Sequence, residues 1–225
     1  LTVSSAASDV YKRQLFFLIA ISSNVLFSQN FLKTSGRNII NQNGDTIVLR
    51  GMGLGGWMVQ EGYMMAPGGF SGTQFQIRDN ITDLIGEEET EKFYNKWLNN
   101  HVRKIDIDSM KAWGFNLVRV PIHYNLFTKP IEEETFPGSY TDIEKGYTLL
   151  DSLLEWCKVN EMYMMIDLHA APGGQGYNAD ISDYDSSKFS LWESVANQDK
   201  TVELWKRLSQ RYKNEEWVAG SDLIN

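Results

Sequence analysis

Short apolar runs alternate along this chain with longer stretches in which apolar residues recur every three or four positions. A short apolar run bounded by turn-forming residues is typical of a strand buried on both faces. Such strands are predicted at 49–55, 115–122, 162–168 and 222–225. The longer spacing predicts amphipathic helices at 87–113, 141–160 and 191–214. The first helix is predicted to break near Asp106 or Asp108, since either residue is a good helix cap.

The segment before the first strand has the pattern of a β-hairpin. Apolar residues at 38–40 and 46–49 flank the turn-forming sequence 41–45, which contains Asn-Gly. Glycine-rich loops follow the strands, at 62–72 and 170–187. The order is therefore a hairpin followed by strands that alternate with helices, which favours an α/β fold with a parallel sheet covered by helices.

A glycine-rich turn at 51–56 is superficially similar to the G-x-G-x-x-G turn that holds phosphate in doubly wound sheets. That phosphate-binding turn leads directly into a helix, whereas here about thirty residues of irregular sequence come first, so we exclude dinucleotide binding. Long loops after each strand instead favour a (β/α)8 TIM barrel, which typically needs about 250 residues. We expect such a barrel, truncated after about the fourth strand, with an N-terminal β-hairpin.

The first 28 residues differ from the rest of the chain. Residues 1–14 have no periodicity, and we interpret them as a cloning or sequencing artefact, with a disordered leader as the alternative. Residues 15–28 form an apolar run too short to span a bilayer, which is typical of a secretory signal peptide; a buried helix is the alternative. We therefore expect a secreted protein, extracellular, periplasmic or at the cell surface, with no membrane association after cleavage.

Composition and charge limit the classes of partner and cofactor. The formal net charge is −8 and no basic cluster is present, which argues against nucleic acid or an anionic membrane as partner. Three His and one Cys, widely spaced, give no metal-ligand pattern, and we expect no metal or other cofactor. Cys157 lies in an apolar helical pattern and is predicted to be a small core residue. Oligomeric state is left open.

Polar residues stand at or just after the C-terminal ends of the predicted strands: Glu61, Arg119, His169 and Asn225. Those ends converge on one site in a barrel. Arg119 interrupts an apolar strand, where a charge requires a carboxylate or a polar cleft; a structural ion pair is the alternative to a functional role. His169 precedes a tight loop, which favours a site over a core position, and Asp167 is predicted to be its partner or a barrel-layer residue.

Four segments together resemble glycoside hydrolase family 5, a cellulase-like family, and especially its exo-β-1,3-glucanase-like branch. The matching segments are 50–61, 114–122, 166–173 and 222–225, within a resemblance that covers about residues 36–225. The resemblance implies that 29–225 is the N-terminal half of a TIM-barrel hydrolase domain acting on β-glucan-type polysaccharides or oligosaccharides. It also implies a retaining mechanism with two carboxylates about 5–5.5 Å apart. The acid/base Glu would follow Asn225, and the nucleophile would lie on the seventh strand.

The resemblance also implies roles for particular residues. Arg119 would hydrogen-bond the nucleophile, His169 would contact substrate and the same cluster, and Asn225 would hold the substrate 2-hydroxyl. Glu61 would bind hydroxyls of a terminal glucose.

The remaining substrate-binding candidates are less closely tied to the family pattern. Trp57 and Tyr124 could supply apolar walls for a sugar ring. His123 stands where the branch often has Gly, and Asn178 lies in a loop one residue shorter than the branch pattern. These departures leave the sugar, the linkage and exo or endo action open.

Two other functions fit the same motifs. A carbohydrate-binding barrel without catalysis is one alternative, and a transglycosylase is a weaker one. The residue that follows Asn225 would separate catalysis from binding, since Glu there supports catalysis. We expect the 225-residue chain by itself to hydrolyse no glycoside, because both carboxylates would be missing and the sheet would have open edges.

Overall fold

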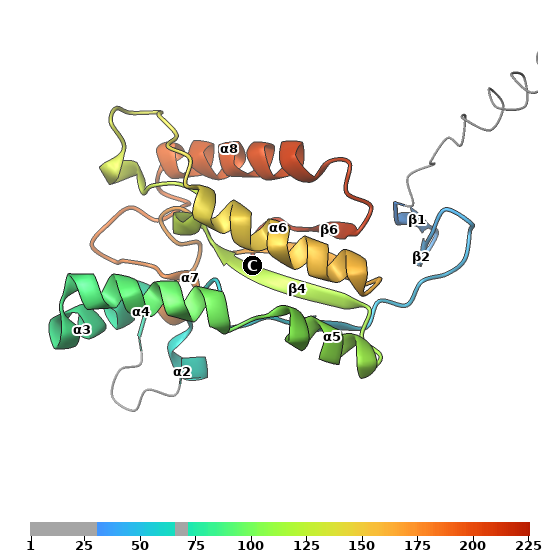
Figure 1. Ribbon diagram of the computed structural model, residues 1–225. Coiled ribbons are helices and arrows are strands. Elements are labelled where there is room, and N and C mark those ends of the chain that lie inside the picture. Colours follow the sequence, from blue (N-terminus) through green and yellow to red (C-terminus); the bar gives the residue numbers. More distant parts are fainter. Residues whose placement is uncertain (1–30, 66–71) are drawn as a thin grey trace, which may run out of the picture. The chain divides into compact units, whose positions relative to one another are not determined.

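The computed structural model describes residues 31–65 and 72–225, and its centre is a parallel four-stranded sheet (Figure 1). The strands follow one another across the sheet in chain order: β3 (Gly51–Gly53), β4 (Leu117–His123), β5 (Tyr163–Ala170) and β6 (Val218–Asp222). Parallel neighbours in sequential order are the arrangement of a (β/α)8 barrel. The predicted fold class is confirmed, as the first half of such a barrel.

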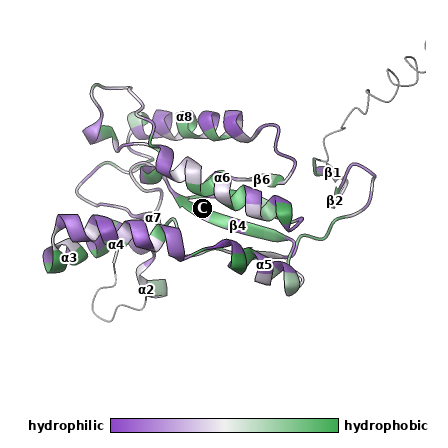
Figure 2. Ribbon diagram, viewed as in Figure 1, coloured by the Kyte–Doolittle hydropathy of each residue, from purple (hydrophilic) through white to green (hydrophobic). Residues whose placement is uncertain are grey.

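Helices occupy every connection between these strands. The connection from β3 to β4 contains α2 (Gly62–Met65), α3 (Gln74–Ile85), α4 (Glu87–Asn100) and α5 (Lys104–Ala112). The later connections contain two 3-10 helices, η2 (Tyr124–Leu126) and η3 (Ile131–Glu133), then α6 (Glu144–Val159), α7 (Ala179–Ser182) and α8 (Val195–Tyr212). In Figure 2, most of β4 is coloured hydrophobic, whereas α4 and α8 carry long hydrophilic stretches. The polar faces of these helices are thus the solvent-facing ones.

Helix α6 shows how the apolar pattern builds the core. Its buried residues recur at helical spacing and include Tyr147, Leu150, Leu154 and Cys157. They pack with the interior residues of β4 and β5 in one hydrophobic cluster. Cys157 has no exposed surface, and burial raises the pKa of its thiol to about 12, so the prediction of a core residue is confirmed.

The connection between β3 and β4 is more helical than predicted. Helix α3 falls in a stretch that we interpreted as irregular, although its start carries a capping box. Thr73 Oγ1 accepts the Gln76 N–H at 3.3 Å, and Gln76 Oε1 accepts the Thr73 N–H at 3.2 Å. The helix break is also earlier than predicted, at 101–103, because Asp106 is the third residue of α5 and accepts the Arg103 N–H.

Two strand predictions were shifted along the sequence. The hairpin pairs β1 (Lys33–Ser35) with β2 (Asn38–Ile40), whereas the predicted partner at 46–49 makes only an isolated bridge, Ile40 to Thr46. The last strand ends at Asp222 and is half-buried rather than buried. Beyond it the chain continues along β5, where the Asn225 N–H donates to Leu168 O at 3.3 Å.

The predicted leader (1–14) and signal peptide (15–28) lie outside the described residues. Within 31–65 and 72–225, no helix combines the length and the apolar composition needed to cross a membrane.

A buried ion pair fastens the loop after β4 to helix α8. Lys200 Nζ contacts Glu134 Oε1, and both side chains are about as buried as the core. Thr141 adds its backbone N–H and its hydroxyl to the same carboxylate, at 2.9 and 2.7 Å. Burial alone would raise the pKa of Glu134, but Lys200 and Thr141 outweigh it and hold that pKa at about 2.

We predict that Lys200→Met lowers the free energy of unfolding by about 3 kcal/mol, because it leaves the Glu134 carboxylate buried without its cation. The matched control is Lys206→Met, which removes an exposed lysine of the same helix that pairs with Glu203 at 3.6 Å and should change stability by less than about 0.5 kcal/mol. Urea unfolding of the purified proteins measures both. Equal losses in the two variants would contradict the structural role assigned to the buried pair.

Candidate active site

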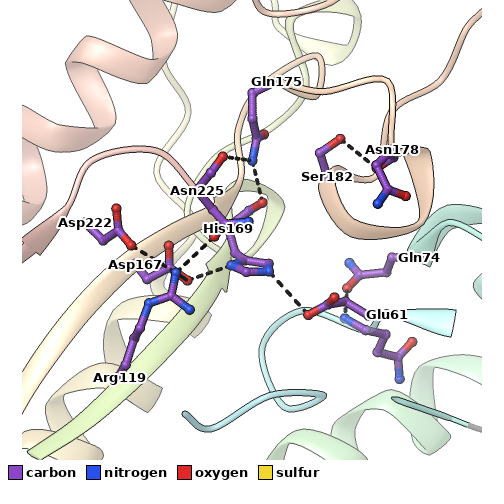
Figure 3. A network of polar contacts seen from close by, with 11 residues as sticks. Glu61, Gln74, Arg119, Asp167, His169, Gln175, Asn178, Ser182, Asp222 and Asn225 are labelled. Atoms are coloured by element: carbon purple, nitrogen blue, oxygen red, sulfur yellow. Dashed lines mark hydrogen bonds and ion pairs between the residues drawn. The ribbon is translucent and has the colours of Figure 1, made fainter. Parts of the chain in front are cut away.

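A histidine held between two buried carboxylates forms the centre of the candidate site (Figure 3). His169 Nδ1 lies 2.7 Å from Asp167 Oδ2, and His169 Nε2 lies 3.3 Å from Glu61 Oε1. An ionised carboxylate only accepts hydrogen bonds, so Nδ1 is the donor to Asp167. The Nε2 atom is then the ring position that faces Glu61.

Arg119 connects this histidine cluster to the end of β6. Its Nη2 atom lies 3.0 Å from Asp167 Oδ2 and 2.9 Å from Asp222 Oδ2. The same nitrogen donates to Asn225 Oδ1 at 3.1 Å. Asp167 has no exposed surface, and its second oxygen, Oδ1, has no hydrogen-bond partner among the described residues. The guanidinium therefore compensates a fully buried carboxylate, which is the partner that its apolar strand required.

A register shift in the sheet determines where the imidazole points. Ile122 of β4 is opposite Leu168 of β5, and the next residue, His123, is opposite Ala170. His169 is thus the extra residue of a β-bulge, a feature that turns a side chain away from the regular alternation. Glu61 reaches the same place because Met58, three residues before it, bridges to Ile122 beyond the end of β3.

Gln175 holds the backbone around the histidine and was missed in the sequence. Its Nε2 donates to His169 O at 2.7 Å and lies 3.5 Å from Asn225 O, while its Oε1 accepts the Ala171 N–H at 3.1 Å. A tight turn returns Gln175 to the strand end. At Gly173 φ is +81°, and a Cβ would lie 2.8 Å from Phe189 O. The Pro-Gly-Gly sequence was the available signal for this turn.

The structure brings Glu61, Arg119, His169 and Asn225 into this one network, although Arg119 is the third residue of β4 and not at its end. Trp57 is elsewhere: it is 1% exposed, and its indole N–H donates to Leu98 O at 2.8 Å. The prediction that Trp57 forms an open wall for a sugar was wrong, because its ring is part of the core.

The other predicted residues lie outside the network. His123 is 1% exposed, and its Nε2 atom lies 2.8 Å from Asp183 Oδ2. Tyr124 is half-buried and stacks on the His123 ring at 5.0 Å, where both line a pocket of about 420 Å³. Asn178 is exposed at the start of α7, and its backbone oxygen accepts the Ser182 hydroxyl (Figure 3). Substrate contact by Tyr124, His123 or Asn178 stays a prediction.

The site brings several hydrogen-bond donors and acceptors close together. Guanidinium, imidazole, carboxylate and amide groups meet at the C-terminal ends of the strands, where a β/α barrel forms its active site. Such a set suits a ligand with many hydroxyl groups, each of which both donates and accepts. In the described part of the chain, no three His, Cys, Asp or Glu side chains are grouped as a metal ion would require.

Comparison with known proteins identifies the relatives of this chain. The family model described as "Cellulase (glycosyl hydrolase family 5)" matches residues 71–225. A protein named beta-xylosidase from Phanerodontia chrysosporium is 35% identical over 196 residues, which cover 87% of this chain and 39% of that protein. Probable glucan 1,3-beta-glucosidase A from Aspergillus niger is 26% identical over 183 residues, covering 79% and 41%. The chain thus spans about two fifths of the length of these relatives.

A solved structure supports the fold independently of close sequence similarity. The rutinosidase from Aspergillus niger superimposes with a TM-score of 0.59 at 18% identity. The match covers 78% of this chain and 48% of that chain. At this identity the likeness concerns the fold, and it agrees with the barrel order of the four strands.

We predict that Asp167→Asn lowers the free energy of unfolding by about 3 kcal/mol, because it removes the buried negative charge that faces Arg119 and His169. Asp222→Asn is the matched control, since Asp222 meets the same Arg119 nitrogen but its side chain is 37% exposed. The control should lose about 1 kcal/mol or less. Urea unfolding at neutral pH compares the two. A larger loss in the Asp222 variant would show that Arg119 is stabilised mainly from the exposed side.

Proposed function

Because the chain belongs to glycosyl hydrolase family 5, we propose that the protein hydrolyses O-glycosidic bonds in β-glucan-type polysaccharides or oligosaccharides. The observation that supports this most directly is the polar network at the C-terminal ends of the strands, which joins Glu61, Arg119, His169 and Asn225. The proposal concerns the whole enzyme, since its relatives extend well beyond the length of this chain.

The mechanism proposed is a retaining one with two carboxylates. In the complete enzyme, a glutamic acid that follows Asn225 would protonate the leaving oxygen, and a second carboxylate would attack the anomeric carbon. Arg119 would hydrogen-bond the second carboxylate and keep it ionised. The described contacts of Arg119 use Nη2, which leaves Nη1 and Nε as donors for that carboxylate.

Asn225 is well arranged to hold the substrate 2-hydroxyl. Its side-chain oxygen accepts from Arg119, so the amide NH2 is directed to another acceptor. A hydrogen bond to the 2-hydroxyl strengthens in the transition state of glycoside hydrolysis. Glu61 and the Nε2 atom of His169 would contact further hydroxyls of the same sugar.

The sugar that we propose as substrate is based on the names of the relatives. Glucan 1,3-beta-glucosidases and endoglucanases support a glucose-based substrate, while the 35% identical beta-xylosidase supports a xyloside. These two sugars differ by one hydroxymethyl group, so one site can bind both with a modest preference.

We propose that the enzyme is secreted through the segment 15–28, and N-terminal sequencing of the secreted protein would test this.

We predict that the product of the complete reading frame hydrolyses nitrophenyl β-glucoside, β-xyloside or laminarin, and that proton NMR detects the β-anomer first.

In the same enzyme, Arg119→Lys should lower kcat/KM about 100-fold, since a point charge replaces a fork of fixed donors. The control is Lys96→Arg, at an exposed position of α4, which should leave kcat/KM unchanged.

Two outcomes would contradict the proposal. An α-anomer as first product would exclude the retaining mechanism. Absence of hydrolysis, combined with binding of laminari-oligosaccharides by calorimetry, would instead identify a carbohydrate-binding barrel without catalysis.

A further inference from the structure

The start of helix α3 is tied to the backbone beside Glu61. Gln74, the first residue of α3, accepts the Gln60 N–H on its Oε1 atom at 2.8 Å (Figure 3). Gln60 and Glu61 are each 3% exposed, so neither has room to move independently of its surroundings. The place of the first turn of α3 therefore determines where the Glu61 carboxylate stands relative to His169.

That first turn is held from its other side by Asp183. The Phe75 N–H, which has no partner within the helix, donates to Asp183 Oδ1 at 2.9 Å. A carboxylate at a helix N-terminus is also favoured by the helix dipole. The neighbouring Gln76 N–H is satisfied locally by Thr73, whereas the partner of the Phe75 N–H comes from a distant loop.

Asp183 is itself fixed by a buried histidine. The Nδ1 atom of His123 accepts the Asn125 N–H at 3.1 Å, so the ring proton is on Nε2, which donates to Asp183 Oδ2 at 2.8 Å. Asp183 has a left-handed backbone conformation, with φ +54°, directly after α7. Aspartate is one of the few residues other than glycine that adopts it readily. Both carboxylate oxygens are thus committed to defined donors.

We propose that Asp183 is a positioning residue of the candidate site. It holds the first turn of α3, and α3 holds Gln60 and Glu61 in place against His169. His123, which the sequence suggested as a substrate contact, acts in this arrangement by orienting Asp183. The catalytic consequence rests on the proposed function, in which Glu61 binds hydroxyls of the substrate rather than the bond that breaks. Loss of Asp183 should therefore raise KM and leave kcat nearly unchanged.

Hydrogen exchange at the Gln60 amide tests the structural step without any activity, in the product of the complete reading frame. Asp183→Ala removes the acceptor of Phe75 and should speed exchange at Gln60 about tenfold, the effect of losing about one hydrogen bond. Asp183→Asn keeps an oxygen for Phe75 but cannot accept from His123, and should change exchange by about twofold or less. Unchanged exchange at Gln60 in Asp183→Ala would overturn the proposal.

Steady-state kinetics test the functional step. Asp183→Ala should raise KM about tenfold with kcat within about twofold, because the change acts by displacing Glu61. In a Glu61→Gln background the same substitution should have no further effect on KM, since the group that it positions is already altered. Asp185→Ala is the control: Asp185 lies in the same loop, but its Oδ1 accepts from Ser187.

The outcomes separate the two proposals. A KM increase that persists in full in the Glu61→Gln background, or that also appears in Asp185→Ala, would overturn the positioning role. If the unsubstituted enzyme hydrolyses no glycoside, the glycosidase proposal fails, and hydrogen exchange at Gln60 still decides whether Asp183 positions this segment.

Discussion

The site depends on one carboxylate that has no contact with solvent. Asp167 lies inside the sheet, where an ionised group is stable only if cations and donors surround it. One of its oxygens meets both Arg119 and His169, and Arg119 continues to Asp222 and Asn225. Side chains therefore join β4, β5 and the chain after β6. The geometry of the whole site follows from this one buried charge.

A second buried charge pair fixes the loop after β4. Glu134 and Lys200 are paired inside the protein, whereas pairs such as Lys206 with Glu203 are exposed on α8. Solvent screens the exposed pairs and leaves the buried one strong. The long βα loops would carry substrate contacts in a barrel, and a buried pair gives such a loop a defined position without lengthening the strands.

The sequence was most informative where one physical rule decided the outcome. Apolar runs located β4 and β5 to within a few residues, because burial on both faces leaves no alternation to misread. The same rule anticipated that Arg119 would need a carboxylate. The roles of Asp183 and Gln175 were not predictable in this way, because each depends on a distant loop being folded against the sheet. Trp57 was misassigned since an aromatic ring suits a core and a sugar wall equally well.

Local signals were present for some of the errors. Thr73 and Gln76 have the spacing of a capping box, which would have located α3 despite its weak apolar pattern. The Asn-Gly turn does form, with the Gly44 N–H donating to Asn41 O. However, β2 forms its ladder with β1, which precedes it, and not with the segment after the turn, so the predicted hairpin was shifted along the sequence. A turn signal identifies where the chain reverses and does not by itself identify which segments form the ladder.

The bulge at His169 has a consequence for how this scaffold can vary. The direction of the imidazole is decided by an extra residue within β5, before the loop that begins after Ala170. Insertions, deletions or new aromatic residues in that loop beyond Gln175, which holds the His169 backbone, can therefore remodel what lies above the strand ends without turning the imidazole. Shortening β5 by one residue, in contrast, would restore regular pairing with β4 and point this ring away from Glu61. The loop can thus vary in length and sequence, whereas a change in the length of the preceding strand would change the direction of the His169 ring.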